Sequence, residues 1–191
     1  MKLEQYRKET LRTMPDLGSR TFDSLHMTVG MITELGEIND ALETTEDMVD
    51  IVNLSEEIAD LRWYMSNYAN LYSFEFKDTP QIPCSAGELI QWEDYEDAYF
   101  DMMKYTILLL DMDKKSFAYG KSFQTAYRID IFTYLNNAFL HFAKYWSIDL
   151  KEAMELNIAK LRARFPDKFD TDKAINRDLD VERKILEGNI N

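Results

Sequence analysis

Glycine and proline, the residues that most often end helices and form tight turns, are scarce in this chain, with 6 and 4 copies among 191 residues. A β-sandwich or an α/β fold of this length needs more turns than so few of these residues favour. Apolar residues make up 46% of the chain, enough for a sizeable core. The sequence therefore predicts one all-α domain over residues 1–191.

Apolar residues recur at helical spacing in two long stretches, each broken near its middle. Residues 24–74 read as a long helix, a short break and a long helix, and residues 88–146 repeat that layout. Two such helical hairpins predict a four-helix-bundle core, with a short helix before it over residues 2–12. The two halves are interpreted either as a duplication or as the general likeness of bundle helices.

Capping patterns predict where several helices begin. Thr45, followed by two acids, is the expected N-cap of the second helix of the first hairpin. Ser85 to Glu88 forms a capping box that predicts the start of the third long helix, and residues 149–152 form another, at the start of a helix over 149–166. The highly charged residues 170–191 are expected to form a C-terminal helix or arm.

Charge and cysteine content exclude several classes of protein. The chain has 35 acidic and 22 basic residues, a net charge of −13, so we expect no nucleic-acid partner. The most apolar run, residues 106–110, is far too short to span a membrane, and the charged N-terminus does not read as a signal peptide. A single cysteine, Cys84, rules out a disulfide framework. We expect a cytoplasmic protein with no membrane partner.

Two pairs of acids are the strongest chemical signal. Glu34 and Glu37 lie in one helix of the first hairpin, and Glu57 and Asp60 lie in the other. Residues three apart share a helix face, so the pairs can meet across the hairpin. Four carboxylates that face one another would repel strongly unless a cation lay among them. Oxygen ligands favour Mg²⁺, Mn²⁺ or Ca²⁺ over zinc.

Two other interpretations of these acids stay open. They can be solvated surface charges, although apolar residues flank both pairs and the hairpin over 88–146 has no such facing acids. A di-iron site is the second alternative, but such sites usually take Glu-x-x-His motifs, and neither His26 nor His141 lies three residues after a glutamate.

The acids and their surroundings resemble the all-α NTP pyrophosphohydrolases of the MazG-like type, which are related to the dimeric dUTPases. The family signature is ExxE, a spacer and ExxD, and here 19 residues separate Glu37 from Glu57. Residues 25–43 and 55–65 resemble the two metal-binding helices, and residues 157–169 resemble the segment that follows. The family often has Lys where this chain has Glu43.

This resemblance implies a hydrolase that cleaves a (d)NTP between the α and β phosphates, giving a (d)NMP and pyrophosphate. It implies that the four acids bind Mg²⁺, or Mn²⁺ in its place, and that Glu37 accepts a proton in catalysis. Asn157, Lys160 and Arg164 match the family's order of substrate contacts, and the last two share a helix face. They can also form an ordinary basic helix end.

Three further residues are candidates for lining the same site. Tyr64 follows Asp60 by one helical turn, and it and its neighbour Trp63 can stack on a base or sugar, or pack in the core. His26 precedes Glu34 by two turns and can line the same cleft, or serve as a structural histidine. The resemblance also favours a homo-oligomer, a dimer first.

Two other functions remain open at this stage. One is hydrolysis of another pyrophosphate compound, such as an alarmone or a modified nucleotide. The other is a non-enzymatic helical protein that binds nucleotides or another partner.

Overall fold

The computed structural model describes residues 1–43 and 49–188, and within them it contains helices and no β-strand. The helices are α1 (Leu3–Thr13), α2 (Arg20–Leu42), α3 (Ile51–Leu71), α4 (Tyr95–Tyr119), α5 (Thr125–Tyr145), α6 (Leu150–Arg164), α7 (Thr171–Ile175) and α8 (Leu179–Leu186). The prediction of an all-α fold is therefore confirmed. No helix in these residues is both long and apolar enough to cross a lipid bilayer.

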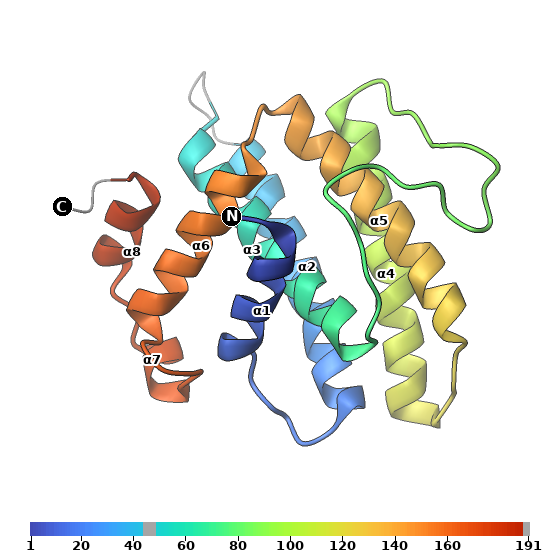
Figure 1. The fold of residues 1–191 in the computed structure, drawn as a ribbon, viewed down its shortest axis with the longest axis horizontal. Coiled ribbons are helices and arrows are strands. Elements are labelled where there is room, and N and C mark those ends of the chain that lie inside the picture. Colours follow the sequence, from blue (N-terminus) through green and yellow to red (C-terminus); the bar gives the residue numbers. More distant parts are fainter. Residues whose placement is uncertain (44–48, 189–191) are drawn as a thin grey trace.

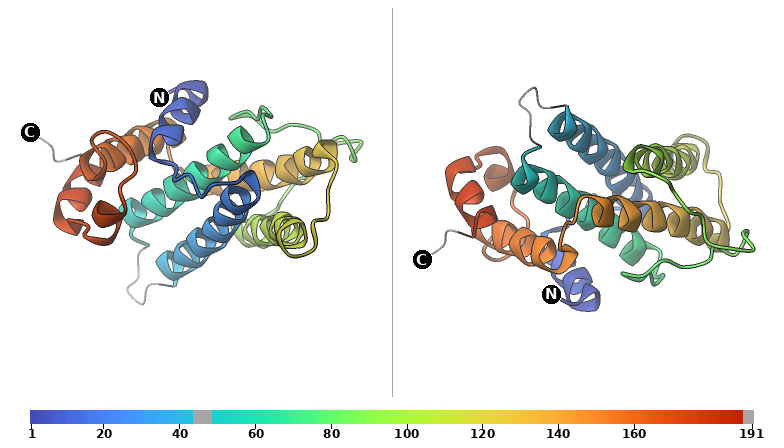
Figure 2. Two further views of the ribbon diagram at one scale, coloured as in Figure 1. Left: turned by 90° about the horizontal axis from the view of Figure 1, so that it is seen from below. Right: turned by 90° about the horizontal axis from the view of Figure 1, so that it is seen from above.

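The four longest helices enclose the main apolar core. Helix α2 packs against α3 and α4, and α4 packs against α5 (Figures 1 and 2). Helices α3 and α5 are also in contact: the rings of Tyr68 and Phe132 stack in parallel, with their centroids 6.1 Å apart. Leu35, Ile58 and Leu135 are fully buried in this core. The predicted apolar stripes therefore face one another.

A buried ion pair ties the same four helices together. Arg128 of α5 donates to the Asp113 carboxylate of α4 at 2.6 Å, and both side chains are almost completely buried. Thr28 of α2 donates to the same carboxylate at 3.2 Å, while Tyr68 of α3 accepts a hydrogen bond from Arg128. Because each charge has a partner, the pair can remain ionised away from water.

The second long helix begins with an aspartate cap. The Asp50 side chain accepts from the amides of Val52 and Asn53 at 3.0 and 3.1 Å, and α3 then starts at Ile51. The cap predicted at Thr45 lies outside the described residues.

The predicted start of the third long helix is wrong. Helix α4 begins at Tyr95, and its N-cap is Asp94, not Ser85. The Ser85 amide donates instead to Asp130 of α5, and its hydroxyl lies 3.1 Å from that of Tyr134. Contacts with α5 thus hold this segment as a loop across the outside of the hairpin, which local sequence could not reveal.

Helices α1 and α6 pack against α3, and α8 packs against α6. Helix α6 begins at the predicted N-cap Asp149, whose side chain accepts from two amides of its first turn. Helix α1 packs against α3 and α6, and α8 turns back along α6 (Figure 1). Ile185 and Leu186 of α8 are buried. The charged C-terminal segment is therefore anchored, up to Gly188, by an apolar face.

The core makes a testable prediction. Leu135→Ala removes a fully buried side chain from α5 and should lower the free energy of unfolding by about 2–5 kcal/mol, because it leaves a cavity. Urea unfolding measures the change. Leu11→Ala is the matched control. Because Leu11 is 51% exposed, this change should lower the free energy of unfolding far less. Equal losses in the two variants would contradict the packing described here.

Candidate functional site

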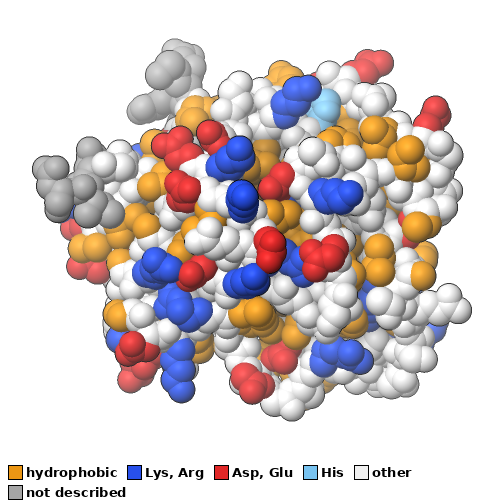
Figure 3. Space-filling model, in the orientation of Figure 1, with side chains coloured by type: hydrophobic (Ala, Val, Ile, Leu, Met, Phe, Trp, Pro, Cys, Tyr) orange, Lys and Arg blue, Asp and Glu red, His pale blue; other side chains and the backbone are white. Residues whose placement is uncertain are grey.

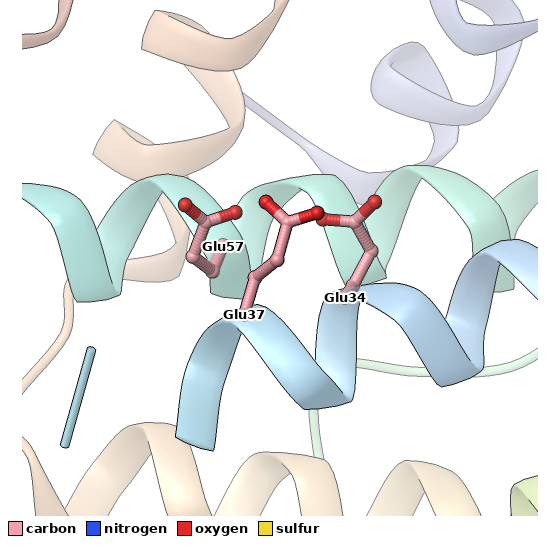
Figure 4. A group of neighbouring side chains, drawn as sticks. All are labelled: Glu34, Glu37 and Glu57. Atoms are coloured by element: carbon pink, nitrogen blue, oxygen red, sulfur yellow. The ribbon is translucent and has the colours of Figure 1, made fainter. Parts of the chain in front are cut away.

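Three of the four predicted acids meet between α2 and α3. Glu34, Glu37 and Glu57 each offer a carboxylate oxygen, and the three oxygens lie within 4.8 Å of one another. Figure 4 shows the side chains of α2 and α3 directed into the space between the helices, with their carboxylates in a row. The three-residue spacing on α2 places two acids on the face that packs against α3.

The cluster is largely removed from water. Glu34 and Glu57 each expose only 8% of their surface, whereas Glu37 is exposed. Burial raises the pKa of Glu57 to about 8, with Asp60 and Glu37 adding to the effect. Burial, followed by the charges of Asp60 and Glu37, likewise raises the pKa of Glu34 well above its ordinary value. Both shifts arise because negative charges share a poorly hydrated space.

Asp60 lies beside the cluster, and side chains of α6 donate hydrogen bonds to its carboxylate. Its carboxylate accepts hydrogen bonds from Asn157 and from Lys160, each at 2.5 Å. Tyr6 of α1 in turn donates to the Asn157 amide oxygen at 2.8 Å. Lys160 also pairs with Glu56 at 2.9 Å. Helices α1 and α6 therefore fix the orientation of Asp60.

This placement differs from the expectation that Asn157 and Lys160 contact substrate. Asn157 is fully buried and Lys160 is 1% exposed. Neither lines the pocket beside the acids. Their polar groups are already directed at Asp60, and we interpret both as residues that position this carboxylate.

The donor set fits a hard divalent cation. Three carboxylates close together provide oxygen ligands and negative charge, which suit Mg²⁺, Mn²⁺ or Ca²⁺. Glu34 and Glu57 have no salt bridge among the described residues, so a negative charge on either one has no cationic side chain bonded to it. The typical di-iron bundle site includes histidine ligands, whereas the group of possible ligands found here in the described residues consists of three glutamates.

A pocket of about 480 Å³ opens beside the acids. Its lining also includes aromatic side chains, among them Trp63, Tyr64 and Phe165. Trp63 is 8% exposed, and its indole N–H donates to Thr13 at 3.0 Å. The pocket therefore offers the surface of aromatic rings next to carboxylate groups.

Tyr64 reaches its place because residue 30 has no side chain. A Cβ atom built at Gly30 would lie 2.1 Å from the Tyr64 ring, closer than two carbon atoms can approach. Burial, and then the nearby Glu34, raises the pKa of the Tyr64 hydroxyl above its ordinary value, so the ring stays neutral. His26 lies against the same ring, with centroids 6.0 Å apart.

His26 also lines the pocket, which is one of the two places that the sequence allows for it. Burial lowers its pKa, although Asp23 acts in the opposite direction. The imidazole is therefore neutral at neutral pH. Its Nδ1 is buried and has no hydrogen-bond partner among the described residues.

Two arginines form the basic part of the pocket wall, and only one was predicted. Arg164 ends α6, and Arg177 follows α7. Both pair with Glu182 of α8, at 2.5 and 2.9 Å. Sequence reasoning missed Tyr6, Arg177 and Glu182, because they belong to segments read only as a short helix and a charged arm.

Comparisons of this chain with protein-family models, with curated proteins and with solved structures find no match. No family is assigned to it on that basis. The case for a function depends on the site itself.

The buried acids predict an unusual pH dependence of stability. Glu57 has an ordinary pKa of 4.5 in the unfolded chain and about 8 in the folded one. The unfolded state therefore loses this proton first, and the metal-free protein loses stability as the pH rises from about 4.5 to about 8. Glu57→Gln should melt at a higher temperature than wild type at pH 8, with a smaller difference at pH 5.

Thermal melting with and without Mg²⁺ checks this prediction. Mg²⁺ should raise the melting temperature of the wild type at pH 8 but have little effect on Glu57→Gln. Glu88→Gln is the matched control, since Glu88 is exposed and should behave like wild type. A Glu57→Gln variant less stable than wild type at pH 8 would contradict the electrostatic account.

Proposed function

We propose that this protein is an Mg²⁺-dependent nucleoside triphosphate pyrophosphohydrolase, which cleaves a (d)NTP to a (d)NMP and pyrophosphate. The observation that carries the proposal is the cluster of Glu34, Glu37 and Glu57, which is buried in part and lines a pocket, with no salt bridge to Glu34 or Glu57 among the described residues. A metal ion there would complete the cluster and attract a polyphosphate to an otherwise acidic protein. The resemblance of both acid pairs to the MazG-like signature supports the same reaction.

Each acid has a defined place in the proposal. Glu34, Glu37, Glu57 and Asp60 would hold Mg²⁺, which supplies charge neutralisation and lowers the pKa of water. Glu37 is the exposed member of the cluster, so it is the carboxylate best placed to accept a proton from water. Asn157 and Lys160 fix Asp60, so that little reorganisation is needed when the site is used.

The rest of the pocket matches the remaining parts of a nucleotide. Tyr64 and Trp63 offer ring surface for the base or sugar, and Arg164 offers a guanidinium for phosphate. His26 is neutral and can donate or accept a hydrogen bond without adding charge. The two hairpins would form the four-helix-bundle scaffold, and in the part of the chain that the structure describes the cluster of acids lies in the first hairpin.

We also propose that the protein forms a homodimer. The outer side of α4 exposes Phe100, Ile107 and Phe117, by 68%, 49% and 52%. The Phe117 ring packs edge-on against Phe22 of α2, which is also about half exposed. Burial of these side chains would favour self-association, and sedimentation velocity tests for a dimer.

A substrate panel separates the proposed reaction from its two alternatives. Release of pyrophosphate from common NTPs and dNTPs supports the proposal and reveals the preferred base and sugar. Turnover limited to an alarmone or to a modified nucleotide indicates a specialised pyrophosphate hydrolase. Mg²⁺-dependent binding of nucleotides with no turnover indicates a non-enzymatic binding protein.

Glu37→Gln tests the role of the cluster in catalysis. The change preserves shape and removes one charge, so turnover should fall about 100-fold or more. Folding should survive, because one member of a repulsive group has been neutralised. Circular dichroism checks the fold, and Glu93→Gln on the exposed surface is the matched control. Unchanged turnover in Glu37→Gln would contradict the proposed catalytic role of the cluster.

The position of bond cleavage gives an independent prediction. Hydrolysis in H₂¹⁸O should place the label in the monophosphate, because water attacks the α phosphorus. Phosphorus NMR detects the small shift that ¹⁸O causes. Label in pyrophosphate would indicate attack at the β phosphorus, and a nucleoside diphosphate with orthophosphate as first products would exclude the proposed reaction.

A further inference from the structure

Arg164 and Arg177 are brought together by one carboxylate. Glu182 accepts from Nε and Nη2 of Arg164 at 2.7 and 2.5 Å, and from Nε and Nη2 of Arg177 at 3.3 and 2.9 Å. The three residues come from α6, from the segment after α7 and from α8. All three line the pocket that contains the acid cluster.

Glu182 lies beneath the two guanidinium groups. Its side chain is 6% exposed, whereas those of Arg164 and Arg177 are 15% and 40% exposed. Helix α8 keeps the carboxylate there because the neighbouring Ile185 and Leu186 are buried. Two guanidinium groups repel each other, and a carboxylate between them offsets that repulsion.

The arrangement retains both charge and hydrogen-bonding capacity. Two guanidinium groups and one carboxylate leave a net charge of +1 beside a cluster of acids. The hydrogen bonds to Glu182 use Nε and Nη2 of each arginine, so the Nη1 groups of both arginines take no part in them. Guanidinium N–H groups match the geometry of phosphate oxygens.

Other basic residues of the pocket region are already paired. Lys160 is buried against Glu56 and Asp60. Arg183 pairs with Asp50 and with Glu187 at 3.1 and 2.7 Å. Figure 3 shows basic side chains near α6 and α7 interspersed with acidic ones. Arg164 and Arg177 share a single carboxylate and so keep a net positive charge, which makes them the guanidinium pair best placed to meet an anion in the pocket.

We infer that Arg164 and Arg177 form a two-arginine clamp for the diphosphate portion of the substrate, the part that leaves as pyrophosphate, and that Glu182 positions them. This inference rests on the proposed function and adds Arg177 and Glu182 to its site. The clamp makes the enzyme selective for polyphosphates over monophosphates, because a monophosphate has no diphosphate portion to bind.

Arg177→Gln is the principal test, because the side chain is half-exposed and its loss should leave the fold intact. Titration calorimetry with imidodiphosphate in the presence of Mg²⁺ should show affinity reduced about 10-fold or more. Affinity for a nucleoside monophosphate should stay within about 2-fold of wild type. KM for the triphosphate should rise by more than kcat falls. Arg177→Lys keeps the charge but loses the planar guanidinium group, so its affinity for imidodiphosphate should lie between those of wild type and Arg177→Gln.

Arg162→Gln is the matched control, since Arg162 lies on the same helix but pairs with Glu9 on the surface. It should bind imidodiphosphate as wild type does. Glu182→Gln should weaken imidodiphosphate binding too, because the guanidinium groups lose the group that orients them. Tighter binding in Glu182→Gln would mean that this carboxylate competes with phosphate, and would overturn its positioning role.

The outcomes separate the clamp from the proposed reaction. Pyrophosphate release by wild type with unchanged imidodiphosphate affinity in Arg177→Gln would overturn the clamp and leave the proposed reaction standing. Absence of both turnover and triphosphate binding in a wild-type protein that binds Mg²⁺ would overturn the proposed function and the clamp with it. Selective loss of imidodiphosphate affinity in Arg177→Gln supports both.

Discussion

Repulsion among partly buried carboxylates is the constraint on which the site depends. Glu34, Glu37 and Glu57 meet between α2 and α3 because apolar residues on the same helix faces pack in the core. Packing holds the acids at a separation that they would not adopt alone. Burial, and then the charges of Asp60 and Glu37, raise the pKa of Glu57. A protein can retain such a cluster when a cation restores the balance during function.

The neighbouring helices limit this repulsion without removing it. Lys160 reaches Asp60 and Glu56 from behind, and Asn157 adds a hydrogen bond to the same aspartate. Neither residue neutralises Glu34 or Glu57. The protein therefore places a carboxylate held by two hydrogen bonds, that of Asp60, beside acids that have no salt bridge among the described residues. The two arginines held by Glu182 line the same pocket. A pocket with acids and guanidinium groups suits a metal–polyphosphate complex better than either component alone.

The sequence predicted what depends on local periodicity and missed what depends on distant contacts. The long helices and the meeting of Glu34, Glu37 and Glu57 follow from 3–4 residue spacing. The start of α4 does not, because Ser85 bonds to α5 rather than capping a helix. The position of Lys160 on a helix face allows a phosphate contact or an ordinary basic helix end, and it gives no sign of the acids against which the side chain is buried. The charged C-terminal segment hid the few apolar residues that anchor α8 against α6.

The central claim is that the three carboxylates form a divalent-cation site, and anomalous diffraction from a crystal grown with Mn²⁺ tests it most directly. The account predicts an anomalous peak between α2 and α3, within bonding distance of oxygens from Glu34, Glu37 and Glu57. The peak should disappear in Glu57→Gln crystals grown in the same way. A wild-type map with no peak there, or with Mn²⁺ only at exposed surface acids, would contradict the account.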